Sequence, residues 1–332
     1  MVEAVLSQEG PKISVTGVAS LHNRIFVAFH KSNKIDVHRA DGPVFLKLHE
    51  IPVKELRGPW DLAACKMRRC LYVTDSATNR LWRLAVPELE LAEDPSCDDL
   101  PSFSEGNRTV GKTSLESAVR SLQLVKEESQ PKKITISRTD VQTMTTLTAK
   151  MMKLLDGISA PHTVCVISDG RLLLAKSRPP SCLEIYNPSQ STGKLQPLQS
   201  LLLPTDIADP QYAIETTVGT FFVSHGDDRI SEVSFSSDGH TPGTLVRTSD
   251  IRLNLAMPKH LVLDEDGGVI VADCTNGRVL HLDQRLVLKR VILNEKDDQL
   301  LKPHRLSYDH HTGRLIVAQK NGIANVKIVS LK

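Results

Sequence analysis

Residues 258–283 read PKHLVLDEDGGVIVADCTNGRVLHLD, and this stretch decides the fold. It begins with a proline, continues as a strand of alternating apolar and polar residues, and turns at Asp266 and Gly267. The run VIVA that follows is continuously apolar, which is typical of a strand buried on both faces. A polar loop then leads into a third short strand. Alternation with Gly and Asp turns at this spacing predicts an antiparallel meander.

The same pattern occurs six times along the chain. The six segments start at Val15, Pro59, Pro161, Pro210, Pro258 and Pro303, and only the first lacks the proline. The starts are 44, 102, 49, 48 and 45 residues apart, and a more variable fourth strand follows most units. Because this spacing fits a four-stranded blade, we predict an all-β, six-bladed β-propeller.

The two ends of the chain are predicted to share one blade. The last unit, residues 303–332, is too short for a fourth strand, and VEAVL near the N-terminus has strand character. Closing a ring removes the exposed edges of an open sheet. We therefore expect the N-terminal strand to complete the sixth blade and residues 1–332 to form a single propeller domain.

Residues 87–149 interrupt the second unit between its third and fourth strands. They are rich in Glu, Ser, Lys and Pro, a composition that cannot bury enough apolar surface to fold alone. Residues 113–116 fit a helix capping box, and residues 139–149 fit a second helix. The blade count favours a strand at residues 151–155. The insertion is interpreted either as a tolerated surface loop or as a docking tether.

Composition limits the classes of partner. The chain carries 41 Lys and Arg against 39 Asp and Glu, so any strongly basic region must be local. It has neither an apolar run long enough to span a membrane nor a secretory signal, and we expect a cytoplasmic protein without membrane contact. The six cysteines are scattered without a CxxC pair. We expect reduced thiols and no cofactor or metal.

Two units carry a sharper signature. The strand LYVTD at 71–75 is followed by Asn79 and Arg80, and VIVAD at 269–273 by Asn276 and Arg278. This pattern resembles the NHL repeat, found in the propellers of tripartite-motif proteins and in uncharacterised invertebrate single-propeller proteins. Nothing in this chain resembles the RING, B-box or coiled coil of the tripartite-motif ligases. Within the repeat we expect a structural role, tying loops and blades together, for Asp75, Asn79, Arg80, Asp273, Asn276 and Arg278.

One face of a propeller surrounds the central channel and is the usual binding surface of such folds. The start of each first strand and the loop between the second and third strands open on this face, which we call the mouth face. Its predicted binding residues are Trp60, His162, Gln211, Lys259, His260, His304, Arg305, Lys31, Lys34, Lys176, Arg178, His225, Arg229 and Lys320.

Ring closure makes blades six and one neighbours, which predicts a basic sector on the mouth face. This sector contains His304, Arg305, Lys320, Lys31 and Lys34. It is interpreted either as a site for phosphate or an acidic peptide or as ordinary solvated loops.

Enzymatic alternatives rest on few residues. His162, His260 and His304 surround the mouth as zinc ligands would, and peptide-amidating lyases with related propellers use histidines in similar settings. However, His260 is one residue out of phase. Asp61 and Glu215 are the nearest match to the carboxylates of calcium-dependent propeller lactonases. No nucleophile elbow or Gly-rich phosphate loop occurs, so we expect no catalytic residue.

The sequence thus favours a non-enzymatic interaction module that binds a peptide or protein on the mouth face. A small-molecule ligand is disfavoured. Single-stranded RNA is the alternative partner, although an aromatic content of 4% leaves Trp60 as the one obvious stacking platform. A metal-dependent hydrolase or lyase ranks third.

Overall fold

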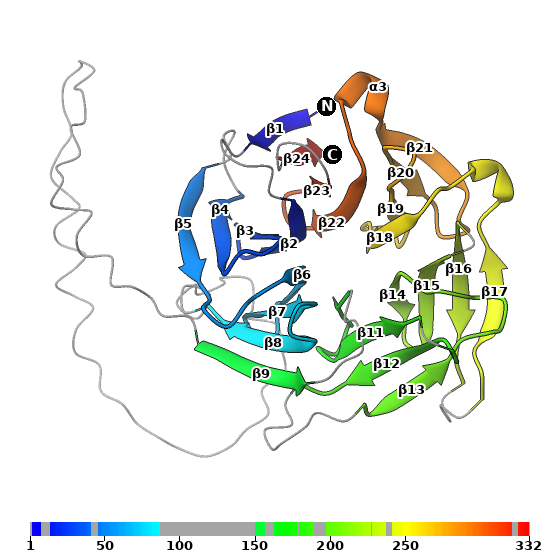
Figure 1. The fold of residues 1–332 in the computed structure, drawn as a ribbon. Coiled ribbons are helices and arrows are strands. Elements are labelled where there is room, and N and C mark those ends of the chain that lie inside the picture. Colours follow the sequence, from blue (N-terminus) through cyan, green and yellow to red (C-terminus); the bar gives the residue numbers. More distant parts are fainter. Residues whose placement is uncertain are drawn as a thin grey trace, which may run out of the picture. The chain divides into compact units, whose positions relative to one another are not determined.

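The computed structural model describes residues 2–7, 14–40, 46–86, 150–156, 163–177, 179–188, 197–226, 228–236, 241–320 and 325–331. Within them, 24 strands form six separate four-stranded antiparallel sheets. The sheets surround a common centre, with the first strand of each blade innermost and the fourth outermost (Figure 1). The prediction of an all-β, six-bladed propeller is confirmed.

Each blade is a simple meander, and the blades follow one another along the chain. Blade one contains β2 (Val15–Leu21), β3 (Arg24–Phe29), β4 (Lys34–Arg39) and β5 (Lys47–Pro52). Blade two contains β6 (Pro59–Cys65), β7 (Cys70–Asp75), β8 (Arg80–Ala85) and β9 (Lys150–Asp156). Blade three contains β10 (Cys165–Val166), β11 (Leu172–Lys176), β12 (Cys182–Tyr186) and β13 (Gln199–Leu202).

The second half of the ring is built in the same way. Blade four contains β14 (Tyr212–Thr217), β15 (Thr220–His225), β16 (Arg229–Ser234) and β17 (Thr244–Thr248). Blade five contains β18 (Pro258–Leu263), β19 (Val269–Asp273), β20 (Arg278–Leu282) and β21 (Leu288–Leu293). Blade six contains β22 (Pro303–Asp309), β23 (Arg314–Gln319), β24 (Asn325–Ser330) and β1 (Val2–Ser7). Two short helices, η2 (Ile251–Leu253) and α3 (Glu295–Asp298), lie in the connections after blades four and five.

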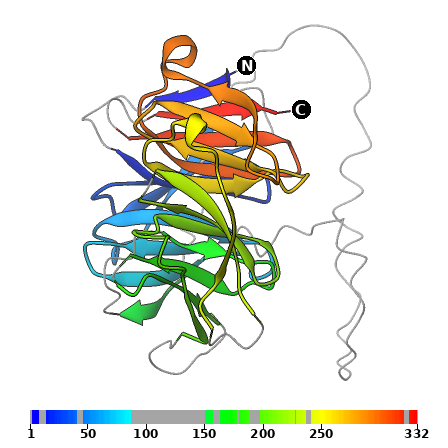
Figure 2. The same cartoon turned by 90° about the vertical axis from the view of Figure 1, so that its right-hand side faces the viewer.

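The ring closes as predicted. Strand β1 pairs antiparallel with β24, with Leu6 opposite Val326, and becomes the outer strand of blade six. Both ends of the chain therefore lie at the same blade, as the two perpendicular views show (Figures 1 and 2).

The interruption of blade two falls where the sequence places it. Strand β8 ends at Ala85, and the strand that pairs with it, β9, begins at Lys150, which confirms a strand at residues 151–155. The helices predicted inside residues 87–149 lie outside the described residues. No helix in the described ranges is long and apolar enough to cross a membrane.

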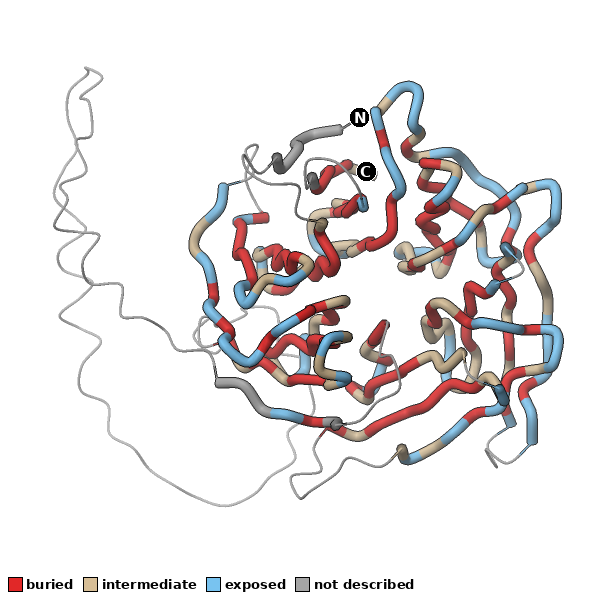
Figure 3. Tube along the Cα trace, in the orientation of Figure 1, coloured by how far each residue is buried: buried red, intermediate tan, exposed pale blue. Residues whose placement is uncertain are grey.

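The core lies between the blades. In each blade, most residues of the second strand are buried. The buried side chains form clusters that join neighbouring blades. Phe26 and Leu71 belong to the cluster between blades one and two, for example, and Ile270 and Leu315 to the cluster between blades five and six. Figure 3 shows the buried residues on the inner strands and exposed ones toward the outer strands and loops. Burying one such side chain contributes roughly 1.5–3 kcal/mol, so the ring is stabilised by its interfaces.

A β-bulge starts the first strand of four blades. The strand register shifts between Val15 and Gly17, and at the equivalent points of blades two, five and six. The extra, unpaired residue is Thr16, Trp60, Lys259 or His304. A bulge re-aims the side chains around it. In blades two, five and six, the bulged residue faces the mouth, and the residue after it is buried.

Candidate functional site

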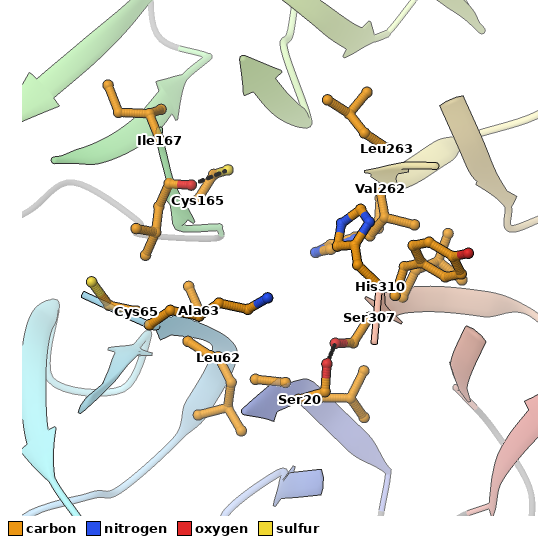
Figure 4. A pocket seen from close by; sticks show the side chains of 18 of the residues that line it. Ser20, Leu62, Ala63, Cys65, Cys165, Ile167, Val262, Leu263, Ser307 and His310 are labelled. Carbon is orange, nitrogen blue, oxygen red and sulfur yellow. Dashed lines mark hydrogen bonds between the residues drawn. The ribbon is translucent and has the colours of Figure 1, made fainter. Parts of the chain in front are cut away.

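Two cavities occupy the central region of the propeller. The mouth pocket, about 420 Å³, is lined by Trp60, Thr163, Gln211, Met257, Lys259, Cys274, Thr275, Lys302, His304, Arg305 and Lys320. The exit pocket, about 460 Å³, is lined mainly by residues 18–20, 62–67, 165–168, 262–263 and 306–308, with Gly170, Tyr212, His260 and His310. Figure 4 shows the exit pocket.

The two pockets lie at opposite ends of the channel. On β18, Lys259 lines the mouth pocket and Val262 lines the exit pocket. On β22, His304 lines the mouth pocket and Ser307 the exit pocket. Since the first strands of the blades run side by side around the channel, their beginnings define one end and their ends the other.

A layer of buried residues separates the pockets. It contains one residue from the equivalent position of each blade, and we call it the channel ring. Its members are Gly17, Asp61, Thr163, Tyr212, His260 and Arg305. The Tyr212 ring lies on the imidazole of His260, with centroids 4.0 Å apart. Burial lowers the pKa of His260, with Arg305 and His304 adding to the effect, so this imidazole is neutral near pH 7.

An ion pair spans the channel ring. The Nε atom of Arg305 lies 2.9 Å from Oδ1 of Asp61, and both side chains are buried. Arg305 also donates to the carbonyl oxygens of Trp60 and His304, while Asp61 accepts from the backbone N–H groups of Leu62 and Val164. Burial raises the pKa of Asp61 to about 6, against the opposing effect of Arg305. The guanidinium of Arg305 thus holds blades together, although the side chain still borders the mouth pocket.

The mouth pocket is basic. Among the described residues, no carboxylate forms an ion pair with Lys259, Lys302 or Lys320. Lys259 Nζ donates to Gln211 Oε1 at 2.6 Å, and burial lowers its pKa. Lys320 Nζ lies 5.5 Å from the centre of the Trp60 ring, a cation–π contact.

Two histidines lie near Trp60, and of these His304 lines the mouth pocket. His30 contacts Trp60 edge-on, with ring centroids 6.2 Å apart. Burial, with Arg305 and Lys320, lowers the pKa of His304 to about 3, so this histidine adds no charge at neutral pH. The positive charge of the pocket therefore comes from the lysines.

Several residues predicted to bind ligand on the mouth face instead line the exit pocket, are buried or form ion pairs within the protein. His260 lines the exit pocket, not the mouth pocket, because the bulge shifts it inward. His225 is buried and hydrogen-bonds to Ser231 Oγ at 2.9 Å. Lys34 pairs with Glu50 at 2.6 Å, and Lys176 with Glu184 at 2.5 Å.

The remaining predicted residues have simpler positions. Lys31 is exposed in the loop after β3, and Arg229 is half-buried at the start of β16. His162 and Arg178 lie outside the described residues. Of the predicted binding set, the structure therefore brings six residues to the mouth pocket: Trp60, Gln211, Lys259, His304, Arg305 and Lys320.

Sequence reasoning missed five lining residues: Thr163, Met257, Cys274, Thr275 and Lys302. A signal existed for three of them. Cys274 and Thr275 occupy the loop between the second and third strands of blade five. The equivalent loops of other blades were predicted to open on the mouth face. Lys302 directly precedes the proline of blade six.

The residues considered as metal ligands do not converge. His304 lines the mouth pocket, but His260 lines the exit pocket. Asp61 is engaged by Arg305, and Glu215 accepts two hydrogen bonds from Ser168 near the exit side. Within the described ranges, no group of three His, Cys, Asp or Glu side chains is placed to hold a metal ion.

The signature residues of blade five hold the connection from blade four. Asp273 accepts hydrogen bonds from Ala256 N, Asn276 Nδ2 and Arg278 Nε. Arg278 also donates to the carbonyl oxygen of Leu253 at 2.5 Å. All three signature side chains therefore form hydrogen bonds within the protein.

Blade two uses its signature differently. Asp75 accepts from the backbone N–H groups of Arg57, Gly58, Ala77 and Thr78, at 2.9–3.2 Å. Asn79 adopts a left-handed conformation with φ of 52°, and the Arg80 guanidinium lies over the Trp82 ring. The aspartate has the same role in the two blades.

Comparison with known proteins shows the fold alone. No family model matches the sequence, and no curated protein sequence is similar to it. Among solved structures, a putative gluconolactonase is 12% identical with a TM-score of 0.60, covering 99% of this chain and 92% of its own. A streptogramin B lyase is 14% identical with a TM-score of 0.58, covering 98% and 96%. A protein of unknown function from Bacteroides thetaiotaomicron is 12% identical with a TM-score of 0.57, covering 98% and 72%.

Proposed function

We propose that this six-bladed propeller is a non-enzymatic binding module of the NHL-repeat kind, and that its mouth pocket takes an acidic segment of a partner protein. The observation that carries the proposal is the set of Lys259, Lys302 and Lys320 around one concave pocket, without carboxylate partners among the described residues. Ammonium groups gathered in this way favour an anionic ligand.

The remaining lining fits a peptide. The half-buried ring of Trp60 offers a large apolar contact, which is typical of residues that dominate peptide and protein interfaces. Gln211 and Thr275 add amide and hydroxyl groups that can hydrogen-bond to a peptide backbone. A segment with carboxylate side chains would therefore meet charge, apolar surface and hydrogen-bonding groups in one cavity.

The NHL assignment rests on blades two and five. In each, an aspartate at the end of the second strand binds the backbone of the preceding connection, and in blade five the Asn and Arg of the signature bind the same region. This use of the signature supports a role in the fold, and it leaves the mouth lysines as the groups free to contact a ligand.

Hydrolase and lyase activities are less well supported. The solved relatives include a streptogramin B lyase and a putative gluconolactonase, but they are at most 14% identical to this chain. The carboxylates and histidines considered for such chemistry are divided between the two ends of the channel or engaged in the channel ring.

The test is binding of a fluorescein-labelled oligoglutamate peptide, followed by fluorescence polarisation at low salt. We expect binding to the full chain and none to an oligoglutamine peptide of equal length. The triple variant Lys259→Gln, Lys302→Gln, Lys320→Gln should bind roughly tenfold more weakly or worse. The matched control Lys54→Gln, Lys289→Gln, Lys296→Gln removes the same charge from exposed sites elsewhere and should bind as the parent does.

Equal weakening in both triple variants would show a non-specific charge effect and contradict the proposal. Single-stranded RNA is the second candidate, favoured by the contact between Lys320 and Trp60 and by exposed Lys31 nearby. RNA binding requires that an oligouridine bind more tightly than oligoglutamate. Its affinity should fall steeply with salt, and Lys31→Glu with Lys320→Glu should abolish it.

A further inference from the structure

Cys65 and Cys70 face each other across the first hairpin of blade two. Cys65 ends β6, Cys70 begins β7, and the two are direct partners in the strand register. Directly opposed residues in antiparallel strands have Cβ atoms roughly 4.5–5.5 Å apart. This is close to the separation that a disulfide spans. Both thiols are free and buried.

The surroundings of the thiol pair favour a negative charge. Arg68 Nε, Arg83 Nε and the Tyr72 hydroxyl are buried and have no hydrogen-bond partner of good geometry in the described part of the chain. Tyr72 lies two residues beyond Cys70 on the same strand and is the register partner of Arg83. A buried donor without a partner is costly, and an anionic sulfur would satisfy such donors.

The acidity of Cys70 agrees with this arrangement. The neighbouring thiol of Cys65, with smaller effects of Tyr72 and the Arg83 charge, lowers the pKa of Cys70 to about 6 against the opposing effect of burial. The pKa of Cys65 is raised, first by its interaction with Cys70 and then by burial. The pair therefore holds one proton and one negative charge near neutral pH, and a thiolate is the reactive form of cysteine.

The exit pocket gives access to the pair. Cys65 lines this pocket, and Figure 4 shows it among the side chains of the wall. The neighbouring hairpin of blade three approaches it with Gly170. A Cβ atom at Gly170 would lie 3.9 Å from Cys65 Sγ and 3.8 Å from Arg68 Nε. The atom nearest to that Cβ position is Met67 Sδ at 3.3 Å, so Met67 flanks the approach to Cys65 from the pocket, and Cys70 lies beyond Cys65 as its register partner.

We propose that Cys65 and Cys70 form a reversible dithiol–disulfide couple, oxidised by hydrogen peroxide that enters through the exit pocket. The Cys70 thiolate attacks one peroxide oxygen, an S–O bond forms, the O–O bond breaks, and the released hydroxide takes up a proton to become water. The sulfur of Cys65 then attacks the Cys70 sulfenic acid. The S–O bond breaks, the hydroxyl leaves with the Cys65 proton as a second water, and the disulfide forms.

Two thiols thus lose two electrons and two protons, and one peroxide becomes two waters. Oxidation removes the negative charge from a site bordered by Arg68, Arg83 and Tyr72. The same thiols pack with Leu172 and Tyr186 in the cluster between blades two and three. The modification would therefore alter the packing at this blade interface and in the wall of the exit pocket. It does not depend on what the mouth pocket binds.

The experiment uses the purified, reduced full chain, treated with hydrogen peroxide at a small molar excess and then alkylated and digested with trypsin. Trypsin cuts at Lys66, Arg68 and Arg69, between the two cysteines. We expect the peptides Gly58–Lys66 and Cys70–Arg80 to be joined, with a mass two hydrogens below their sum, and to separate after dithiothreitol. Cys165, Cys182 and Cys274 should remain alkylated in the same sample.

Variants test the origin of the reactivity. Cys65→Ser should stop at a sulfenic acid on Cys70 that dimedone traps, whereas the matched control Cys182→Ser should leave the disulfide unchanged. Arg83→Gln should slow peroxide oxidation several-fold and move the pH midpoint of Cys70 alkylation upward, and Arg83→Lys should restore both. Thermal melts establish that each variant is folded.

Three outcomes would overturn the proposal. The first is alkylation of Cys65 and Cys70 at the same rate as Cys165 after peroxide treatment. The second is irreversible oxidation of both sulfurs without a linked peptide. The third is disulfide formation that proceeds equally fast in folded Arg83→Gln.

Discussion

Arg305 of blade six and Asp61 of blade two lie 2.9 Å apart at Nε and Oδ1, although blade one stands between these blades in the ring. Blade one supplies Gly17 at the equivalent position, so no side chain from that blade fills the space. Its backbone also lies close to blade two, since a Cβ on Gly17 would come 2.8 Å from Leu62 N. The ion pair therefore connects three blades, two through side chains and one through close backbone packing.

Removing either partner of this ion pair should destabilise the ring. Arg305→Met leaves a buried carboxylate, Asp61→Asn leaves a buried guanidinium, and each should lower the free energy of unfolding by about 3–5 kcal/mol. The double variant should lose less than the sum of the two, because neither charge is then left unpaired. Urea unfolding of the four proteins measures the coupling, and strictly additive losses would show that the pair does not act as a unit.

Gly17→Ala should be unfavourable for a different reason. The added methyl group would overlap the backbone of Leu62, and the strands β2 and β6 would have to separate. We expect a loss of roughly 1–3 kcal/mol in the free energy of unfolding. Asn33→Ala, at an exposed position of the same blade, is the control and should change stability little. A neutral Gly17→Ala would mean that the two blades can move apart freely.

Stability should fall as the pH is lowered, in part through His304. Burial lowers the folded-state pKa of His304 to about 3, below its unfolded value of 6.5. Its contribution is thus present above pH 6.5 and is lost as the pH falls toward 3, by an amount on the order of a few kcal/mol. Asp61 acts in the opposite sense, because its folded-state pKa of about 6 exceeds the unfolded value of 3.8.

Urea unfolding between pH 7.5 and 5 separates these effects. The difference in stability between the parent and His304→Gln should shrink as the pH falls. The control His311→Gln, at an exposed position, should follow the parent at every pH. A constant difference between the parent and His304→Gln would contradict a buried neutral imidazole.

Deletion of residues 1–8 should open the ring. Strand β1 covers β24, and without it the backbone groups along that edge lose their partners. We expect a lower Tm, a less cooperative melt and a tendency to aggregate through the exposed edge. A synthetic peptide with the sequence of Val2–Ser7, added in excess, should restore part of the lost Tm, while a scrambled peptide should not. An unchanged melt after deletion would show that blade six is stable with three strands.

The repeat pattern of the sequence predicted much of this fold. Prolines at the start of the units, glycine turns and continuous apolar second strands gave the blades, and counting strands gave both the ring closure and the fourth strand at β9. These features are local, so they can be read from short segments. The insertion in blade two was recognised because it breaks the spacing between Pro59 and Pro161.

The residues that line the channel could not be predicted from the repeat pattern in the same way. The strand-entry positions, which the sequence assigns to the mouth face, include His260 and Arg305. The bulge after Pro258 and Pro303 places both in the buried channel ring, and of the two only Arg305 still borders the mouth pocket. A bulge depends on backbone geometry and has no signal in these segments. The ion pair was missed because Asp61 and Arg305 belong to different repeats, and only the assembled ring brings them together.

The bulges also affect which positions of such a protein can vary during evolution. In blades two and five, the outward residue is Trp60 or Lys259, and its immediate successor belongs to the buried channel ring. One position can therefore accept new side chains while its neighbour preserves the fold. A gene under selection for a different ligand, or a designer working at the bench, could rewrite the recognition surface one blade at a time without disturbing the scaffold.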